Sequence, residues 1–139
     1  MEETPIVTAN IAVLIVDNDL ENRRVLNTFF KKMKFREIVE VDNGQEAIIS
    51  LANHHIGLVV MELELPVMNG IQLTRHIRKL ARYKDIPILA LSKVETKEMI
   101  IQSLQAGIDA YLKKPPMIDE IYPKIQEAFT RRKQKQTSK

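Results

Sequence analysis

The sequence of 139 residues contains no cysteine, so it forms no disulfide and offers no thiolate nucleophile or thiolate metal ligand. It also lacks any apolar stretch close to the ~20 residues that a membrane-spanning helix needs. The first residues, MEETPIVTAN, are acidic and lack the basic start of a secretory signal peptide. We therefore expect a soluble protein in the cytoplasm, or in the nucleus if the source is eukaryotic.

Positive charge is concentrated at the carboxyl terminus. The net charge is +3, yet the last nine residues carry five Lys or Arg and no acid, so the remainder is slightly acidic. A basic end either contacts nucleic acid or an acidic partner, or is the solvated end of a helix. We favour the solvated helix end and expect neither a membrane nor a nucleic-acid partner.

Apolar runs alternate along the chain with segments of helical periodicity. Apolar runs predict strands at residues 11–16, 57–62 and 86–91, and shorter segments predict strands at 37–41 and 108–112. Apolar residues at helical spacing predict helices at 20–33, around 47–51, and at 71–80, 96–107 and 117 onward. Five strands alternating with five helices favour an α/β fold with a parallel sheet covered on both faces.

One domain is predicted over residues 11–130, with an amino-terminal extension at 1–10 and a basic tail at 131–139. Gly107 is expected to cap the fourth helix. Pro123 falls in the first turns of the last helix if Asp119 caps that helix, and otherwise should kink it.

Polar residues stand where the predicted strands end, which is where parallel sheets of this class bind ligands. They are Asp17 and Asn18 after the first strand, Glu62 at the end of the third, Ser92 after the fourth and Lys114 after the fifth. A carboxylate can accept a phosphoryl group, neighbouring acids can hold Mg²⁺, and a hydroxyl and an ammonium can bind phosphoryl oxygens. The combination points to phosphoryl chemistry.

Four segments resemble the receiver domain of two-component response regulators, across roughly residues 11–130. They are VLIVDND, VVMELELPVMNG, ILALS and GIDAYLKKPP. The resemblance implies a flavodoxin-like (βα)5 fold, a doubly wound parallel sheet with strand order 2-1-3-4-5. It further implies that Ser92 is the switch hydroxyl, Tyr111 the switch aromatic residue and Lys114 the invariant lysine, and that the peptide from Lys114 to Pro115 is cis.

The chain departs from the family at the acids of the pocket. Glu62 stands in place of the phosphoacceptor aspartate, and Asn18 in place of the second strand-one acid, a direct Mg²⁺ ligand. Asp17 keeps the expected type, and Glu64 is a further acid of the pocket. Because Asn18 brings no charge to a cation that prefers carboxylates, we expect Mg²⁺ binding to be weak or absent and no other cofactor.

Lys93 is a third departure, because receivers usually place a small residue directly after the switch hydroxyl. Two alternatives stay open. The lysine either obstructs the path of a phosphodonor and pairs with Glu62 or Glu64, or it points to solvent.

These departures predict a pseudo-receiver, a non-enzymatic protein-interaction module that is not phosphorylated in the usual way. Glu62 either mimics a phosphorylated residue by reaching Lys114, or is a tolerated acid in a vestigial pocket. One alternative is a phosphorylatable receiver of a His-Asp phosphorelay. A remote alternative is a haloacid-dehalogenase-like phosphatase with Asp17 as nucleophile and Asp19 as acid/base.

The resemblance places the signalling surface on the fourth helix, fifth strand and fifth helix, at residues 96–105, 109–113 and 119–129. The expected partner is a histidine kinase, a phosphotransfer protein or a downstream effector, and a homodimer is a further alternative. The fourth predicted helix has a larger number of apolar residues than one buried stripe needs: Met99, Ile100, Ile101 and Leu104. Either one or two of them are exposed for a partner, or all four are core residues, and we favour the core for Ile100 and Leu104 over Met99.

Overall fold

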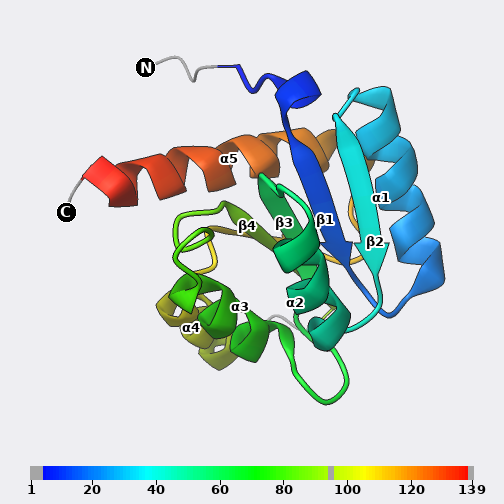
Figure 1. Ribbon diagram of the computed structural model, residues 1–139. Helices are drawn as coiled ribbons and strands as arrows, with labels where there is room; N and C mark the ends of the chain where they lie inside the picture. The colour runs from blue at the N-terminus through cyan, green and yellow to red at the C-terminus, as the bar shows by residue number, and fades with distance from the viewer. Residues whose placement is uncertain (1–4, 94–95, 138–139) are drawn as a thin grey trace.

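The computed structural model describes residues 5–93 and 96–137; residues 1–4 of the predicted extension and 138–139 of the predicted tail lie outside the described residues. The strands are β1 (Ala12–Val16), β2 (Glu37–Val41), β3 (Leu58–Glu62), β4 (Ile88–Ser92) and β5 (Ala110–Lys113). The helices are the 3-10 turn η1 (Thr8–Asn10) and α1 (Leu20–Lys32), α2 (Gly44–Asn53), α3 (Gly70–Lys79), α4 (Lys97–Ala106) and α5 (Ile118–Thr137). The strands form one parallel sheet in the predicted order β2-β1-β3-β4-β5 (Figure 1).

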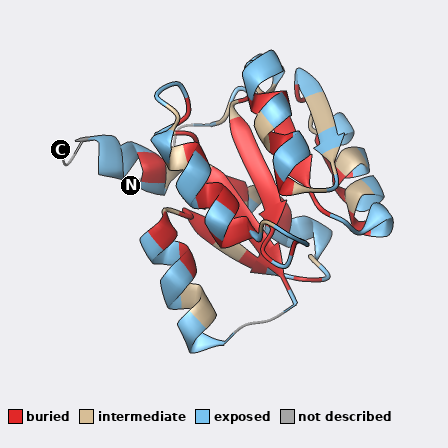
Figure 2. Cartoon of the chain, turned by 60° about the horizontal axis from the view of Figure 1, so that its bottom comes forward, coloured by how far each residue is buried: buried red, intermediate tan, exposed pale blue. Residues whose placement is uncertain are grey.

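Helices cover both faces of this sheet. In β1, Ala12, Leu14 and Val16 pack with residues of α2, α3 and α4. Val13 and Ile15, which point to the opposite face, pack with residues of α1 and α5. The residues of β1, β3 and β4 are all buried, and Figure 2 shows these strands as the buried centre of the molecule. Burial on both faces explains why these strands are continuous apolar runs in the sequence.

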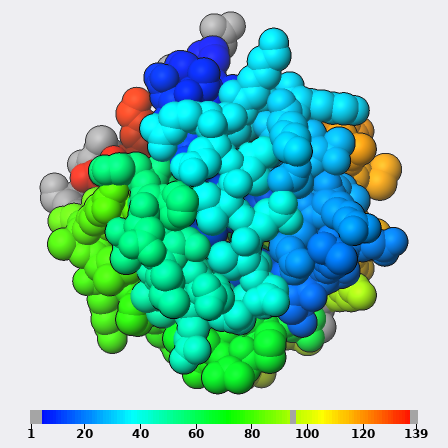
Figure 3. Space-filling view, turned by 45° about the vertical axis from the view of Figure 1, so that its right-hand side comes forward, coloured from blue at the N-terminus to red at the C-terminus, as the bar shows by residue number. Residues whose placement is uncertain are grey.

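The edge strand β2 is half-exposed, unlike the central strands. Figure 3 views the molecule from this edge and shows α1, β2 and α2 side by side on the surface.

Among the described residues, no helix combines the length and the apolar character needed to cross a bilayer.

The carboxyl-terminal helix α5 begins at Ile118, one residue after its predicted start, and continues to Thr137, into the segment predicted as a basic tail. Asp119 is the second residue of α5 and not its cap, so Pro123 is the sixth residue. Proline has no N–H to donate to the carbonyl of Asp119, yet the helix continues to Thr137. Residues 131–137, predicted as a tail, therefore extend α5. Arg131 and residues 133–136 are exposed, whereas Arg132 is buried, so the predicted solvated helix end holds only in part.

The burial of α4 differs from the prediction. Its buried residues are Ser103 and Ala106, while Leu104 is 46% exposed and Ile101 is 44% exposed. Met99 packs against the core as a partly buried residue. The expectation that Leu104 is a core residue is therefore wrong, since Ser103 and Ala106 form the buried side of α4, and Ile100 is only partly buried, as Met99 is. Gly107 does cap the helix, with φ of 111°.

The loop after β3 is held against the end of that strand by Gly70. A Cβ atom on this residue would lie 2.7 Å from the Glu62 carbonyl oxygen and 2.8 Å from Leu63 Cα. The Gly70 N–H donates to the Leu63 carbonyl at 2.8 Å. Asn69 then caps α3, with a reciprocal bond to Gln72. Close backbone approach thus fixes the course of the chain directly after Glu62.

We expect Gly70→Ala to lower the free energy of unfolding by about 1–3 kcal/mol, because backbone atoms must shift to make room. Chemical denaturation measures this change. Gly57→Ala is the matched control, since its new Cβ would meet Ile11 Cγ2 at 3.2 Å, a side-chain methyl that can move. Equal losses in the two variants would contradict the close-approach interpretation.

Candidate functional site

Lys114 lies at the centre of a buried cluster of charged side chains at the carboxyl end of the sheet, which we call the pocket. Its Nζ is 2.8 Å from Asp17 Oδ2, at the end of β1, and 2.7 Å from Glu62 Oε1, at the end of β3. The three side chains are 4%, 1% and 6% exposed, so the ion pairs are shielded from water. The structure therefore brings together the three charged groups that the sequence places at separate strand ends.

The first acid is held from several sides. The Asp19 N–H donates to Asp17 Oδ1 at 2.9 Å, and Asn22 Nδ2 donates to Asp17 Oδ2 at 2.6 Å. Arg23 Nη1 donates to the Asp17 carbonyl oxygen at 2.5 Å. Asn22 and Arg23 are not among the site residues that the sequence predicts. Their place in the first turn of the helix that follows Asp17 is nevertheless a sign that they can reach this acid. With Lys114 counted, both carboxylate oxygens of Asp17 are engaged.

The second acid is engaged as well. Glu62 Oε1 binds Lys114, and Glu62 Oε2 accepts a hydrogen bond from the Glu64 N–H at 3.0 Å. The side chain of Glu64 turns back toward β4, where Ser92 Oγ donates to its Oε1 at 3.3 Å. The Ser92 hydroxyl thus has an internal carboxylate partner, which is Glu64 and not Glu62.

The ends of β4 and β5 are joined beside the pocket. The Lys114 N–H donates to the Ser92 carbonyl oxygen at 2.9 Å, and the half-buried Tyr111 donates its hydroxyl to the same oxygen at 3.5 Å. The Lys114–Pro115 peptide is cis, as the family resemblance implies.

The remaining predicted site residues lie outside this network. Asn18 and Lys93 are exposed, and within the described part of the chain no ion pair joins Lys93 to Glu62 or Glu64. Of the two alternatives for Lys93, the structure matches the solvent-exposed one. Asp19 caps α1, because its side chain accepts hydrogen bonds from the backbone N–H groups of Glu21 and Asn22. That cap occupies the residue that a phosphatase would need as its acid/base.

The pocket keeps its lysine charged. Burial of the Lys114 ammonium acts to lower its pKa, but the hydrogen bonds and charges of Asp17 and Glu62 outweigh burial and raise the pKa above 10.5. The cation therefore stays ionised through the neutral range, where its one positive charge is shared by the two acids beside it.

These residues do not fit a resident Mg²⁺ ion. Within residues 5–93 and 96–137, no three His, Cys, Asp or Glu side chains are grouped so as to hold a metal. Mg²⁺ prefers charged oxygen ligands in octahedral geometry, whereas the carboxylates of Asp17 and Glu62 are both bound to an ammonium.

The sequence matches the family described as response regulator receiver domain over residues 13–126. It is 30% identical to chemotaxis protein CheY-3 of Vibrio cholerae over 126 residues, which cover 91% of this chain and 97% of that protein. It is also 30% identical to chemotaxis protein CheY of Pseudomonas aeruginosa, with 86% and 96% covered.

Among solved structures, the receiver domain of Saccharomyces cerevisiae Ssk1, crystallised with the histidine phosphotransfer protein Ypd1, is 29% identical, with a TM-score of 0.75. The match covers 86% of this chain and 89% of that one. CheY4 of Vibrio cholerae shares the fold at 22% identity and a TM-score of 0.79, with 85% and 98% covered.

Proposed function

The chain belongs to the family of response regulator receiver domains, and we propose that it acts there as a pseudo-receiver. In this proposal it is a non-enzymatic protein-interaction module whose pocket is filled by its own side chains. The observation that carries the proposal is the buried Lys114 ammonium, bound at once to Asp17 and Glu62.

The geometry disfavours the usual phosphotransfer for two reasons. A phosphoacceptor needs a carboxylate oxygen free to attack phosphorus, but both oxygens of Glu62 are engaged. The extra methylene of glutamate also displaces the carboxylate, and a ~1 Å misplacement costs on the order of 10²-fold in rate. Asn18, exposed beside the pocket, supplies no charge that would draw Mg²⁺ in.

We expect the wild-type chain to gain no phosphoryl group when it is incubated with acetyl phosphate and Mg²⁺ and weighed by intact mass spectrometry. The double variant Glu62→Asp/Asn18→Asp should gain one, at a rate at least about 10²-fold above the wild type. That variant returns the acceptor and the missing acid to the residue types that the family uses.

Asp17→Asn added to the double variant is the control, and it should abolish labelling. An acid-stable, base-labile mass gain in the wild type that disappears in Glu62→Gln would sink the proposal. It would instead establish the second candidate, a phosphorylatable receiver of a His-Asp phosphorelay. That candidate is favoured by the convergence of Asp17, Lys114 and Ser92 at one end of the sheet.

The partner that we propose is a protein, and exposed apolar residues mark two surfaces for it. On α4 and at the start of α5, Ile101, Leu104 and Ile118 are 44%, 46% and 67% exposed. Around the pocket, Leu20 is 51% exposed and Val67 is 98% exposed. Exposed apolar residues of this size are suited to a protein interface.

The α4–β5–α5 face suits a downstream effector, or a second copy of this chain in a homodimer. The pocket rim suits a histidine kinase or phosphotransfer protein, by analogy with the Ssk1 receiver crystallised with Ypd1. A cytoplasmic location accompanies this proposal.

A further inference from the structure

The amino end of the sheet, opposite the pocket, carries a concentration of positive charge from two segments. One is the end of α3 with the loop that follows it, and the other is the last part of α5. Together they form what we call the basic amino-end surface: Arg78, Lys79, Arg82, Lys84, Arg131, Arg132, Lys133 and Lys135. Neither residues 78–84 nor residues 131–135 include an acid.

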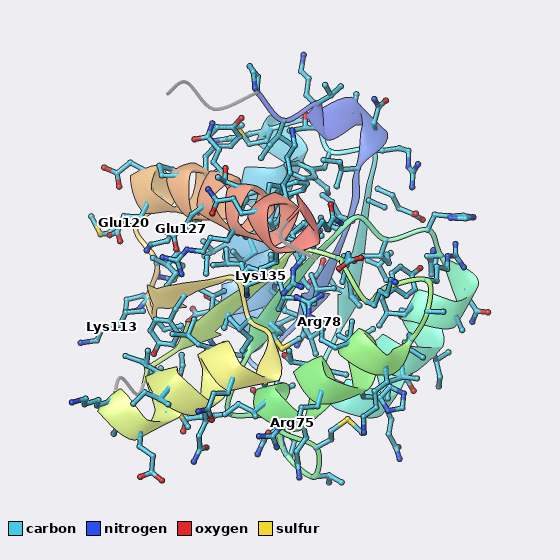
Figure 4. All side chains as sticks on the ribbon, turned by 90° about the vertical axis from the view of Figure 1, so that its left-hand side faces the viewer. Arg75, Arg78, Lys113, Glu120, Glu127 and Lys135 are labelled. Carbon is cyan, nitrogen blue, oxygen red and sulfur yellow. The ribbon has the colours of Figure 1, made fainter. Side chains whose placement is uncertain are left out.

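A buried carboxylate brings the two segments together. Asp109, which is 0% exposed, accepts from Arg78 Nη2 at 3.0 Å and from Arg132 Nη2 at 2.8 Å. Lys135 Nζ lies 3.5 Å from the same side chain, and Arg132 Nη1 lies 4.0 Å from Asp85 Oδ1. Figure 4 shows Arg78 and Lys135 close together between α5 and α3. Segments far apart in the sequence therefore form one surface.

Positive charge on this surface exceeds the negative charge beneath it. Burial, opposed by Asp109 and assisted by the charge of Arg132, lowers the pKa of Arg78 to about 10. Lys79, Arg82 and Lys84 are exposed, and no ion pair joins their side chains to an acid of the described residues. The surface therefore has cations available for an external anion.

The side chains around these cations indicate which polyanion fits. Tyr83, the aromatic residue of the α3 segment, is only 5% exposed, so no aromatic platform for unpaired bases is present on either segment. From residue 131 to 136 the sequence is RRKQKQ, without an apolar residue to insert into a membrane or to centre a protein interface. A polar, cationic surface of this composition fits the phosphate backbone of a duplex.

We propose that the basic amino-end surface binds double-stranded nucleic acid through its phosphates, without reading the sequence. The sequence alone predicts the opposite, because it shows only the α5 part of this surface, whereas the fold adds the α3 part. The pocket rim, one of the two proposed protein-binding surfaces, lies at the carboxyl end of the sheet, opposite the basic amino-end surface. A protein partner at the rim therefore leaves the basic surface open to a duplex. The module then brings its partner to nucleic acid.

Fluorescence anisotropy with a short labelled DNA duplex, at several salt concentrations, tests the proposal. With about four phosphate contacts, log K should fall with log salt concentration at a slope of about −4, equally for two unrelated sequences. Lys79→Gln/Lys84→Gln should reduce the magnitude of that slope by about 2, and Lys133→Gln should reduce it by about 1.

Arg24→Gln/Lys97→Gln is the matched control, because it removes the same charge from exposed positions outside this surface. It should bind as the wild type does, and circular dichroism should show all variants folded. Three results would overturn the proposal: no binding at low salt, equal weakening by the control, or tighter binding to anionic vesicles or poly-glutamate than to the duplex.

Discussion

Lys114→Met is expected to lower the free energy of unfolding by about 3–5 kcal/mol at neutral pH, the usual cost of removing one partner from a buried ion pair. Methionine fills similar space but leaves Asp17 and Glu62 facing each other in a pocket where they are 1% and 6% exposed. Two desolvated carboxylates without a cation repel each other and cannot both stay ionised at low cost. Urea denaturation followed by circular dichroism measures the loss.

The destabilised variant should recover when the stranded charge is removed. Adding Glu62→Gln to Lys114→Met should restore part of the lost stability, because it removes one of the two facing charges. Its amide oxygen can keep the bond from the Glu64 N–H while its NH₂ occupies the side that the ammonium has left. Lys97→Met is the control at an exposed lysine, and it should change stability by no more than about 0.5 kcal/mol.

The pH dependence of this variant separates charge from packing. In the wild type the pKa of Lys114 is raised by folding. Its contribution to the free energy of unfolding is therefore complete below the pKa of the unfolded state, and it is lost as pH rises through the folded-state pKa, above 10.5. In Lys114→Met the loss should shrink on acidification, because protonation of either acid relieves the repulsion. A loss that is the same at acidic and neutral pH would assign the role of Lys114 to packing.

The order of elements follows from the sequence because a parallel sheet buried on both faces leaves a plain signal. The five-residue strands β1, β3 and β4 are buried throughout and contain only apolar residues up to their last position. The turn signals between them are equally local. The strand-end residues follow from the same pattern, whereas the strand order comes from the family resemblance, and that topology is confirmed.

Other features depend on distances that no local pattern contains. Leu104 is exposed because Ser103 and Ala106 form the contact side of α4, and small residues carry little hydrophobic signal. The bond from Ser92 to Glu64 depends on how the loop after β3 turns back. Gly70 permits that turn, but nothing in the sequence assigns a partner to Glu64.

The network around Asp109 is the largest feature absent from the sequence analysis. Arg78 and Arg132, which bind it, lie 31 and 23 positions away in the chain. A single acid between a glycine turn and a strand gives no sign that it is fully buried. Only the packing of α3 and α5 against the start of β5 places these groups together.

Asp109→Asn is the second variant for which we expect a large effect, a loss of about 3 kcal/mol in the free energy of unfolding. Asparagine keeps the shape but removes the charge that opposes the buried guanidinium of Arg132 and the half-buried one of Arg78. Its amide NH₂ would also replace an oxygen that accepts a hydrogen bond. Oδ1 accepts from Arg132 Nε at 3.0 Å, and Oδ2 accepts from the Ile88 N–H at 2.9 Å. Either orientation of the amide therefore sets a donor against a donor.

The loss should lie at the lower end of the range for buried ion pairs because the guanidinium groups keep other acceptors. Arg78 Nη1 donates to the Ile86 carbonyl at 2.6 Å, and Arg132 Nη2 donates to the Gly107 carbonyl at 3.0 Å. Chemical denaturation gives the size of the loss. Asp119→Asn, at an exposed position in the first turn of α5, is the control and should cost well under 1 kcal/mol.

Salt distinguishes this buried network from a surface one. Raising the ionic strength screens exposed charges but reaches a fully buried carboxylate far less, so the loss in Asp109→Asn should persist at high salt. A loss below 1 kcal/mol, or one that vanishes at high salt, would mean that backbone carbonyls alone hold α3 and α5 in place. The expected result instead makes Asp109 the anchor that assembles the basic amino-end surface, so that stability and the proposed binding of a duplex rest on the same buried charge.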